Sequence, residues 1–170
     1  MKNMGCPFNG VLYVGLMLTQ DGPQVVEFNA RFGDPECQIL MALLDSDLVD
    51  ILEAACDGNL DRITIENSPR AAVCVVMASA GYPLSYPKGM VIEGLEQFAT
   101  TNDVVVFHAG TDMRDGQLIS GGGRVLAVTA IADTIALAVE RAYSAVDAIH
   151  FDHAYARRDI AHRALARLKA

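Results

Sequence analysis

Three acids, an amide and an arginine lie close together in the ten residues 27–36, which read Glu-Phe-Asn-Ala-Arg-Phe-Gly-Asp-Pro-Glu. Because a strand projects alternate side chains to one face, Glu27, Asn29 and Arg31 would point the same way. A carboxylate beside an amide oxygen suits Mg²⁺, and a nearby guanidinium suits the phosphate that such a metal carries. The segment therefore predicts a metal and phosphate site.

A β-hairpin is expected to carry this segment. Residues 10–18 are apolar throughout, residues 19–23 read Thr-Gln-Asp-Gly-Pro and indicate a turn, and residues 24–29 read as a second strand. Val26 and Phe28, which alternate with the polar positions, are expected to face a core. An isolated two-stranded hairpin is marginally stable, so the hairpin is expected to need more sheet.

Two helices are expected after the hairpin. The first should begin at Asp34, because an Asp side chain accepts from the open N–H groups of a first turn and Pro35 loses no bond there. Gly33 is expected to supply an unusual backbone angle just before this helix. The second helix is expected to begin at Ser46 and to end at Gly58.

The polar stretch 59–70, which contains a proline, predicts a junction between domains 1–68 and 69–170. Strands are expected beyond it, and Asp133 should cap a helix that runs to about residue 149. The expected strands are 71–79, 90–93, 104–108, 117–120 and 124–130. The predicted fold class is therefore α+β, with a β-hairpin and helices followed by a small, mostly antiparallel β unit and a covering helix.

Composition excludes several classes of function. The net charge of −8 argues against a nucleic-acid partner, and no apolar run reaches the ~18 residues of a membrane span. The N-terminus lacks the apolar stretch of a signal peptide, so a cytoplasmic location is expected. The four cysteines show no Cys-x-x-Cys pair and are expected to be reduced. The basic tail from Arg157 to Lys169 is expected to form a solvated helix face.

Several motifs together resemble one known family. They are Arg-Phe-Gly-Asp-Pro-Glu at 31–36, Gly-Tyr-Pro at 81–83, Phe-His-Ala-Gly-Thr at 107–111 and Gly-Gly-Arg-Val-Leu at 122–126. Together they resemble the C-terminal half of phosphoribosylamine-glycine ligases, also called GAR synthetases, of the ATP-grasp superfamily. The first motif is highly specific, whereas Gly-Gly-Arg alone is weak. The resemblance implies that residues 1–68 are the C-terminal part of an ATP-grasp domain.

That family joins glycine to 5-phosphoribosylamine in de novo purine synthesis, and it uses ATP with Mg²⁺ or Mn²⁺. The resemblance implies that ATP phosphorylates the glycine carboxylate to glycyl phosphate. The amine of phosphoribosylamine then attacks the acyl group and releases phosphate. Such chemistry needs in-line positioning and charge neutralisation more than a protein nucleophile. The implied activity is that of an ATP-dependent carbon–nitrogen ligase.

The matching positions imply roles for individual residues. Glu27 and Asn29 would hold the metal, and Arg31 would face the transferring phosphate or the acyl phosphate. Met17 falls where related hairpins present an apolar residue to adenine, although core packing explains a methionine equally well. Gly15 stands where many relatives carry an acidic metal ligand, so this segment is expected to supply one carboxylate only.

Further residues are implied at the substrates. Asp34 and Glu36 lie in a loop that the family places near the ribose or amine of phosphoribosylamine, while a helix cap explains Asp34 equally well. Gly122 and Arg124 would hold the 5-phosphate through a backbone N–H group and a guanidinium. A plain hairpin turn is the alternative explanation of that glycine run.

The resemblance also implies an N-terminal α/β domain and a mobile lid with lysines, and this sequence contains neither. We therefore expect a truncated product, a split gene or a misplaced start, with the N-terminal half of the enzyme as the missing partner. The isolated chain is expected to fold but to catalyse poorly or not at all. Two alternatives stay open, namely a fragment of another ATP-grasp carboxylate-amine ligase and a non-catalytic assembly module.

Overall fold

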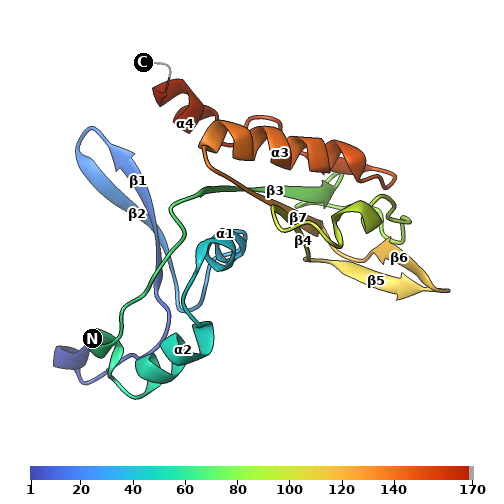
Figure 1. Cartoon of the computed structure of the whole chain (residues 1–170). Helices are drawn as coiled ribbons and strands as arrows, with labels where there is room; N and C mark the ends of the chain where they lie inside the picture. Colours follow the sequence, from blue (N-terminus) through green and yellow to red (C-terminus); the bar gives the residue numbers. More distant parts are fainter. Residues whose placement is uncertain (169–170) are drawn as a thin grey trace. The chain divides into compact units, whose positions relative to one another are not determined.

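The computed structural model describes residues 1–168, which divide into two compact units (Figure 1). The first unit comprises residues 1–37 and 44–68, and the second comprises residues 38–43 and the described chain from Pro69 onward. Lys169, the last residue of the predicted basic tail, lies outside the described residues. None of the four cysteines forms a disulfide. No helix within residues 1–168 has the length and apolar character that crossing a membrane requires.

The predicted hairpin is confirmed as β1 (Tyr13–Thr19) paired antiparallel with β2 (Gly22–Asn29). The expectation that Val26 and Phe28 face a core is wrong, since they are 66% and 64% exposed. In the described part of the chain the hairpin is a sheet of two strands only. Most residues of both strands are exposed, apolar ones included.

The first unit also holds the loop that follows the hairpin and the helix α2. Helix α1 begins at Glu36, so Pro35 occupies the N-cap position and no side chain caps it. The predicted Asp34 cap is therefore wrong. The α2 cap lies one residue later than expected, because Asp47 accepts from the Val49 N–H at 2.7 Å. The bounds of these elements are η1 Lys2–Met4, α1 Glu36–Leu43, α2 Leu48–Cys56 and η2 Leu60–Arg62.

The second unit is built on a four-stranded antiparallel sheet in the order β4-β7-β3-β8, with the separate hairpin β5-β6. Helix α3 lies along one face of this sheet (Figure 1). The bounds are β3 Ala71–Ser79, η3 Glu96–Phe98, β4 Val104–His108, β5 Thr111–Arg114, β6 Gln117–Ser120, β7 Arg124–Ala132, α3 Ile135–Ala148, β8 Ala154–Ala156 and α4 His162–Arg167.

The core of the second unit forms between the central strands and α3. Strands β3 and β7 read as nearly continuous apolar runs, as expected for strands covered on both faces. Small residues on α3 are buried against the sheet, which allows the helix to approach it closely. The buried α3 residues are Ala138, Ala142, Ala145 and Val146.

Two expectations about this unit are wrong in detail. Residues 90–93 form no strand, although isolated bridges pair Val91 with Ile119 and Glu93 with His150. The helix cap is Thr134 rather than Asp133, because the Thr134 hydroxyl accepts from the Leu137 N–H at 3.3 Å. Strand β5 was not expected, because no apolar run marks it.

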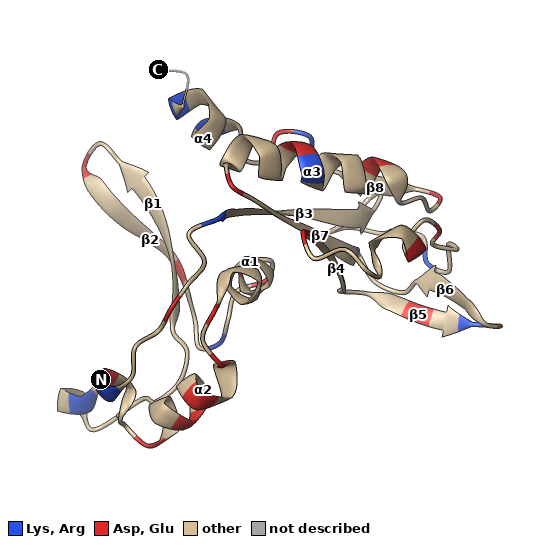
Figure 2. Ribbon diagram, in the orientation of Figure 1, with Lys and Arg blue, Asp and Glu red and all other residues tan. Residues whose placement is uncertain are grey.

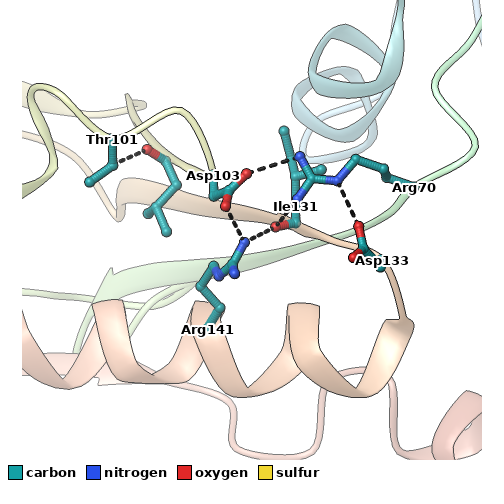
Figure 3. A network of polar contacts seen from close by, with 7 residues as sticks. Arg70, Thr101, Asp103, Ile131, Asp133 and Arg141 are labelled. Atoms are coloured by element: carbon teal, nitrogen blue, oxygen red, sulfur yellow. Dashed lines mark hydrogen bonds and ion pairs between the residues drawn. The ribbon is translucent and has the colours of Figure 1, made fainter.

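A network of charged side chains ties together the start of β3, the start of β4 and helix α3 (Figure 3). Arg70 and Arg141 both pair with Asp103, at 2.9 Å and 2.7 Å from its two carboxylate oxygens. Arg70 Nε also lies 3.4 Å from the Asp133 carboxylate, and Arg141 donates to the Ile131 carbonyl. One carboxylate therefore holds two guanidiniums that come from separate elements.

These contacts change the acidity of Asp103. The hydrogen bond from Arg70 is the largest cause and holds the pKa of the Asp103 carboxyl below its usual range. Burial opposes this shift, and the charge of Arg141 lowers the pKa further. A carboxyl whose pKa is lowered in the folded state stabilises that state above its unfolded pKa, near 4. That contribution is lost as the pH falls through the lowered folded value.

Asp103→Asn should therefore lower the melting temperature at pH 7 by a few degrees, because Arg70 and Arg141 both lose the carboxylate that they share. The difference from wild type should shrink as the pH falls below about 4, where the native carboxyl also takes up a proton. Thermal melts followed by circular dichroism between pH 2.5 and 7 measure this. Asp147→Asn, which breaks the exposed pair with Arg158, is the control and should shift the melt less. Equal shifts for the two variants would contradict the network's role.

Candidate functional site

Glu27 and Asn29 lie side by side on one face of the hairpin. The Asn29 Nδ2 donates to Glu27 Oε1 at 3.0 Å, with Glu27 exposed and Asn29 half-buried. That bond engages the nitrogen of the amide, and the amide oxygen is the atom that a hard cation binds. The two side chains therefore present adjacent oxygen donors on an open face of the molecule.

The register of the hairpin fixes what surrounds this pair. Gly15 lies opposite Glu27 and Tyr13 lies opposite Asn29, so these four positions share one face. A Cβ at Gly15 would lie 3.2 Å from Glu27 Cγ, so the glycine leaves room for the stem of the acid. Alternation along β1 adds Met17 to the same face, where it is 49% exposed.

Glu36 is held beside this face. The Tyr13 hydroxyl donates to Glu36 Oε1 at 3.1 Å across a sequence separation of 23 residues. Gly33 is buried, and a Cβ built on it would overlap Glu36 Oε2. The φ of Gly33 does not lie in the left-handed region, so the expectation of an unusual backbone angle is wrong. The glycine provides space for a carboxylate instead.

The acidity of Tyr13 reflects the charges around it. The hydrogen bond to Glu36 raises the pKa of the Tyr13 hydroxyl, burial adds to the effect, and the charges of Glu36 and Glu27 raise it further. Both carboxylates are therefore near enough to Tyr13 to disfavour a phenolate. The hydroxyl remains a hydrogen-bond donor at neutral pH.

Arg31 does not share the face by strand alternation as expected. Strand β2 ends at Asn29, and the Arg31 guanidinium donates to the Phe32 carbonyl at 2.7 Å. Asp34 is exposed in the turn that follows. Arg31 is therefore folded back on its own loop, and reaching a phosphate would require it to leave that carbonyl.

The donor set fits a hard divalent cation. Within residues 1–168 no group of three or more His, Cys, Asp or Glu side chains is placed to hold a metal. Glu27, Asn29 and Glu36 offer oxygen atoms alone, which suit Mg²⁺ or Mn²⁺ and not a soft metal. A cation held by few protein oxygens takes its remaining ligands from phosphates and water. The face thus suits a cation carried by a phosphorylated ligand.

In the second unit the glycine run 121–123 is occupied by internal contacts. The N–H groups of Gly121 and Gly122 both donate to the Gly110 carbonyl, at 2.8 Å and 2.9 Å. The expectation that the Gly122 N–H binds a phosphate is therefore not supported, because that donor is already used. Arg124 follows as the half-buried first residue of β7.

Packing explains the rest of the glycine run. Ser79 donates to the run twice, from its N–H to the Gly123 carbonyl at 2.8 Å and from Oγ to the Gly122 carbonyl at 3.2 Å. The ring of Tyr82 occupies the space where a side chain on Gly123 would lie. A glycine is needed there because an aromatic ring packs directly on the backbone.

Family models match both units of the chain. Residues 1–37 match "Phosphoribosylglycinamide synthetase, ATP-grasp (A) domain", and residues 72–163 match "Phosphoribosylglycinamide synthetase, C domain". The second match covers more than half of the chain. The chain belongs to the phosphoribosylglycinamide synthetase family. The family that the sequence motifs suggested is therefore confirmed.

Individual relatives agree with this assignment. The phosphoribosylamine–glycine ligase of Brucella melitensis is 48% identical over 170 residues, all of this chain and 40% of that protein. The ligase of Rhodopirellula baltica is 52% identical over 166 residues, 97% of this chain and 38% of that protein. The crystal structure of the ligase from Thermotoga maritima matches with a TM-score of 0.73 and 33% identity, over 87% of this chain and 36% of that one. The chain thus spans about two-fifths of the length of these ligases.

The two family matches divide the candidate residues. All the residues of the hairpin face and its following loop fall within the ATP-grasp segment, whereas Gly122 and Arg124 fall within the C domain. Figure 2 shows that acidic residues outnumber Lys and Arg in the first unit. The first unit therefore offers many carboxylate oxygens and few cationic side chains.

Tyr13 and Gly33 were not singled out from the sequence as parts of the site. The sequence signal for a role of Tyr13 in the site is weak, because a tyrosine in an apolar strand normally indicates packing. The hydrogen bond between Tyr13 and Glu36 joins residues that are 23 positions apart in the sequence, so only the folded chain shows it.

Gly123→Ala should destabilise the second unit by about 1–3 kcal/mol, because the new Cβ would overlap the Tyr82 ring and force it to move. Urea denaturation followed by fluorescence or circular dichroism measures this. Gly121→Ala is the matched control, since its Cβ would meet nothing closer than 3.5 Å. Adding Tyr82→Ala to Gly123→Ala should recover part of the loss. Similar losses at both glycines would contradict the packing explanation.

Proposed function

We propose that this chain is the C-terminal portion of an ATP-dependent ligase that joins glycine to 5-phosphoribosylamine to give glycinamide ribonucleotide. The proposal is supported by the match to both family domains and by relatives named for that ligase. The observation that carries it is the Glu27–Asn29 pair, whose adjacent oxygens lie exposed within the ATP-grasp segment.

In the proposed reaction a glycine carboxylate oxygen attacks the γ-phosphorus of ATP, and ADP leaves. The amine of phosphoribosylamine then attacks the carbonyl carbon of the glycyl phosphate, and phosphate leaves as the amide forms. The amine loses one proton in this step. Both transfers concentrate negative charge on phosphate oxygens, so positioned cations and hydrogen-bond donors lower their barriers.

Glu27 and Asn29 would hold the Mg²⁺ or Mn²⁺ of the ATP complex. The bound ion would supply positive charge to the phosphates during the transfer. Met17 lies on the same face and would contact the adenine. Arg31 would exchange the Phe32 carbonyl for a phosphate oxygen, because a charged acceptor forms the stronger hydrogen bond.

The remaining candidates would contact the second substrate. Asp34 is exposed beside the site, and Glu36 is held at its edge by Tyr13, so both are available to the amine or the ribose of phosphoribosylamine. Arg124 would contribute its guanidinium to the 5-phosphate without help from the Gly122 N–H. We propose that the rest of an ATP-grasp enzyme completes the site, since the chain spans 40% of its Brucella melitensis relative.

A chimera tests this function. The part of the Brucella melitensis ligase that this chain does not cover is joined to this chain at the aligned position. The chimera should release ADP only when glycine and phosphoribosylamine are both present, while the chain alone should show no turnover. Glu27→Gln in the chimera should lower kcat about 10²–10³-fold, because an electrostatic contact to the transferring phosphate is lost.

Glu53→Gln, at an exposed acid on α2, is the matched control and should leave the rate unchanged. A folded chimera without glycine-dependent ADP release would refute the ligase proposal and would favour an assembly module. A normal rate in the Glu27→Gln chimera would remove Glu27 from the cation site.

A further inference from the structure

The carboxylate of Glu36 is held from two sides. The Tyr13 hydroxyl donates to Oε1 at 3.1 Å, and the missing side chain of Gly33 leaves the space in which Oε2 lies. The backbone adds to this arrangement, because the Cys37 N–H donates to the Gly33 carbonyl at 2.9 Å. The Glu36 carboxylate therefore has a defined position, although no side chain caps helix α1, which begins at this residue.

The position of Tyr13 directs that carboxylate toward the proposed cation site. Tyr13 is paired with Asn29 across the hairpin, and its neighbour two residues along, Gly15, is paired with Glu27. Because directly opposed residues project to the same face, the ring of Tyr13 leaves the sheet on the side of the Glu27–Asn29 pair. The raised pKa of Tyr13 agrees with this arrangement, since the charges of Glu27 and Glu36 both contribute to it.

We propose that Tyr13 is a positioning residue that holds Glu36 as the third oxygen donor of the cation site formed by Glu27 and Asn29. This inference rests on the proposed function. It adds Tyr13 to the site and assigns the Glu36 carboxylate to the cation rather than to phosphoribosylamine. Mg²⁺ prefers six oxygen ligands, and Gly15 contributes no carboxylate from β1. Glu36 supplies the second carboxylate from the start of α1 instead.

A tyrosine suits this role for a physical reason. Its hydroxyl is a neutral donor, so it orients the carboxylate without cancelling the charge that attracts a cation. Partners of this kind, one step removed from the metal, commonly change metal affinity 10–100-fold when they are removed. Phenylalanine retains the ring and its packing and removes only the hydroxyl.

The test is Mn²⁺ binding to the whole chain, followed by the electron paramagnetic resonance signal of free Mn²⁺. Tyr13→Phe should weaken binding about 10-fold, and Glu36→Gln about 10–100-fold. Gly33→Ala leaves both side chains intact but displaces the carboxylate, so it should also weaken binding about 10-fold. Glu53→Gln, at an exposed acid on α2, should bind Mn²⁺ like wild type.

A double variant separates positioning from a general structural effect. If Tyr13 acts through Glu36, Tyr13→Phe should weaken binding no further in the Glu36→Gln background. Additive losses would indicate a structural role and would overturn the proposal. Far-UV circular dichroism checks that each variant is folded, and Gly33→Ala provides the test if Tyr13→Phe does not fold.

The outcomes also separate this proposal from the proposed function. If Glu27→Gln abolishes Mn²⁺ binding while Tyr13→Phe, Gly33→Ala and Glu36→Gln bind like wild type, the ligase site stands and the role of Tyr13 is overturned. If the wild-type chain binds no Mn²⁺, or binds it independently of Glu27, both proposals fall.

Discussion

The antiparallel pairing of β1 with β2 is the constraint on which the candidate site depends. It places Gly15 opposite Glu27 and Tyr13 opposite Asn29, and so it decides which side chains share a face. The register shifts directly after Gly15, where Val26 has no partner across the hairpin. The residues that share the candidate cation-binding face are therefore determined by backbone hydrogen bonds, while the side chains would supply the chemistry.

The second unit depends on different interactions. Its sheet is covered by α3 and its core is continuous, and the charged network around Asp103 ties the ends of β3, β4 and β7 to that helix. Its glycine run is a packing feature, because the ring of Tyr82 lies on Gly123 and the Gly122 N–H is used within the fold. In this unit, residues that resemble a binding motif contribute mainly to structure.

Sequence patterns predicted the fold well where burial alone determines an element. Strands β3, β4 and β6 have the expected bounds, because each is an apolar run between turn residues. Strand β5 was missed because Thr-Asp-Met-Arg has no apolar run. Its signal was the Asp115-Gly116 turn, in which both residues have positive φ. The α3 cap was misplaced by one residue because Asp133 pairs with Arg70 instead. The cation site stays a prediction made from Glu27 and Asn29 in the sequence, whereas the Tyr13–Glu36 contact depends on long-range folding.

The open hairpin has a consequence for how the site is maintained. Apolar side chains such as Val26 and Phe28 are exposed on a ribbon of two strands, so the ribbon gains stability from any sheet or helix that covers it. A one-residue slip of the strands would turn Glu27 and Asn29 away from Tyr13. Covering the ribbon therefore also selects the register that keeps the ligands together. Burial of apolar surface and the proposed ability to hold a cation would therefore be thermodynamically linked in this segment.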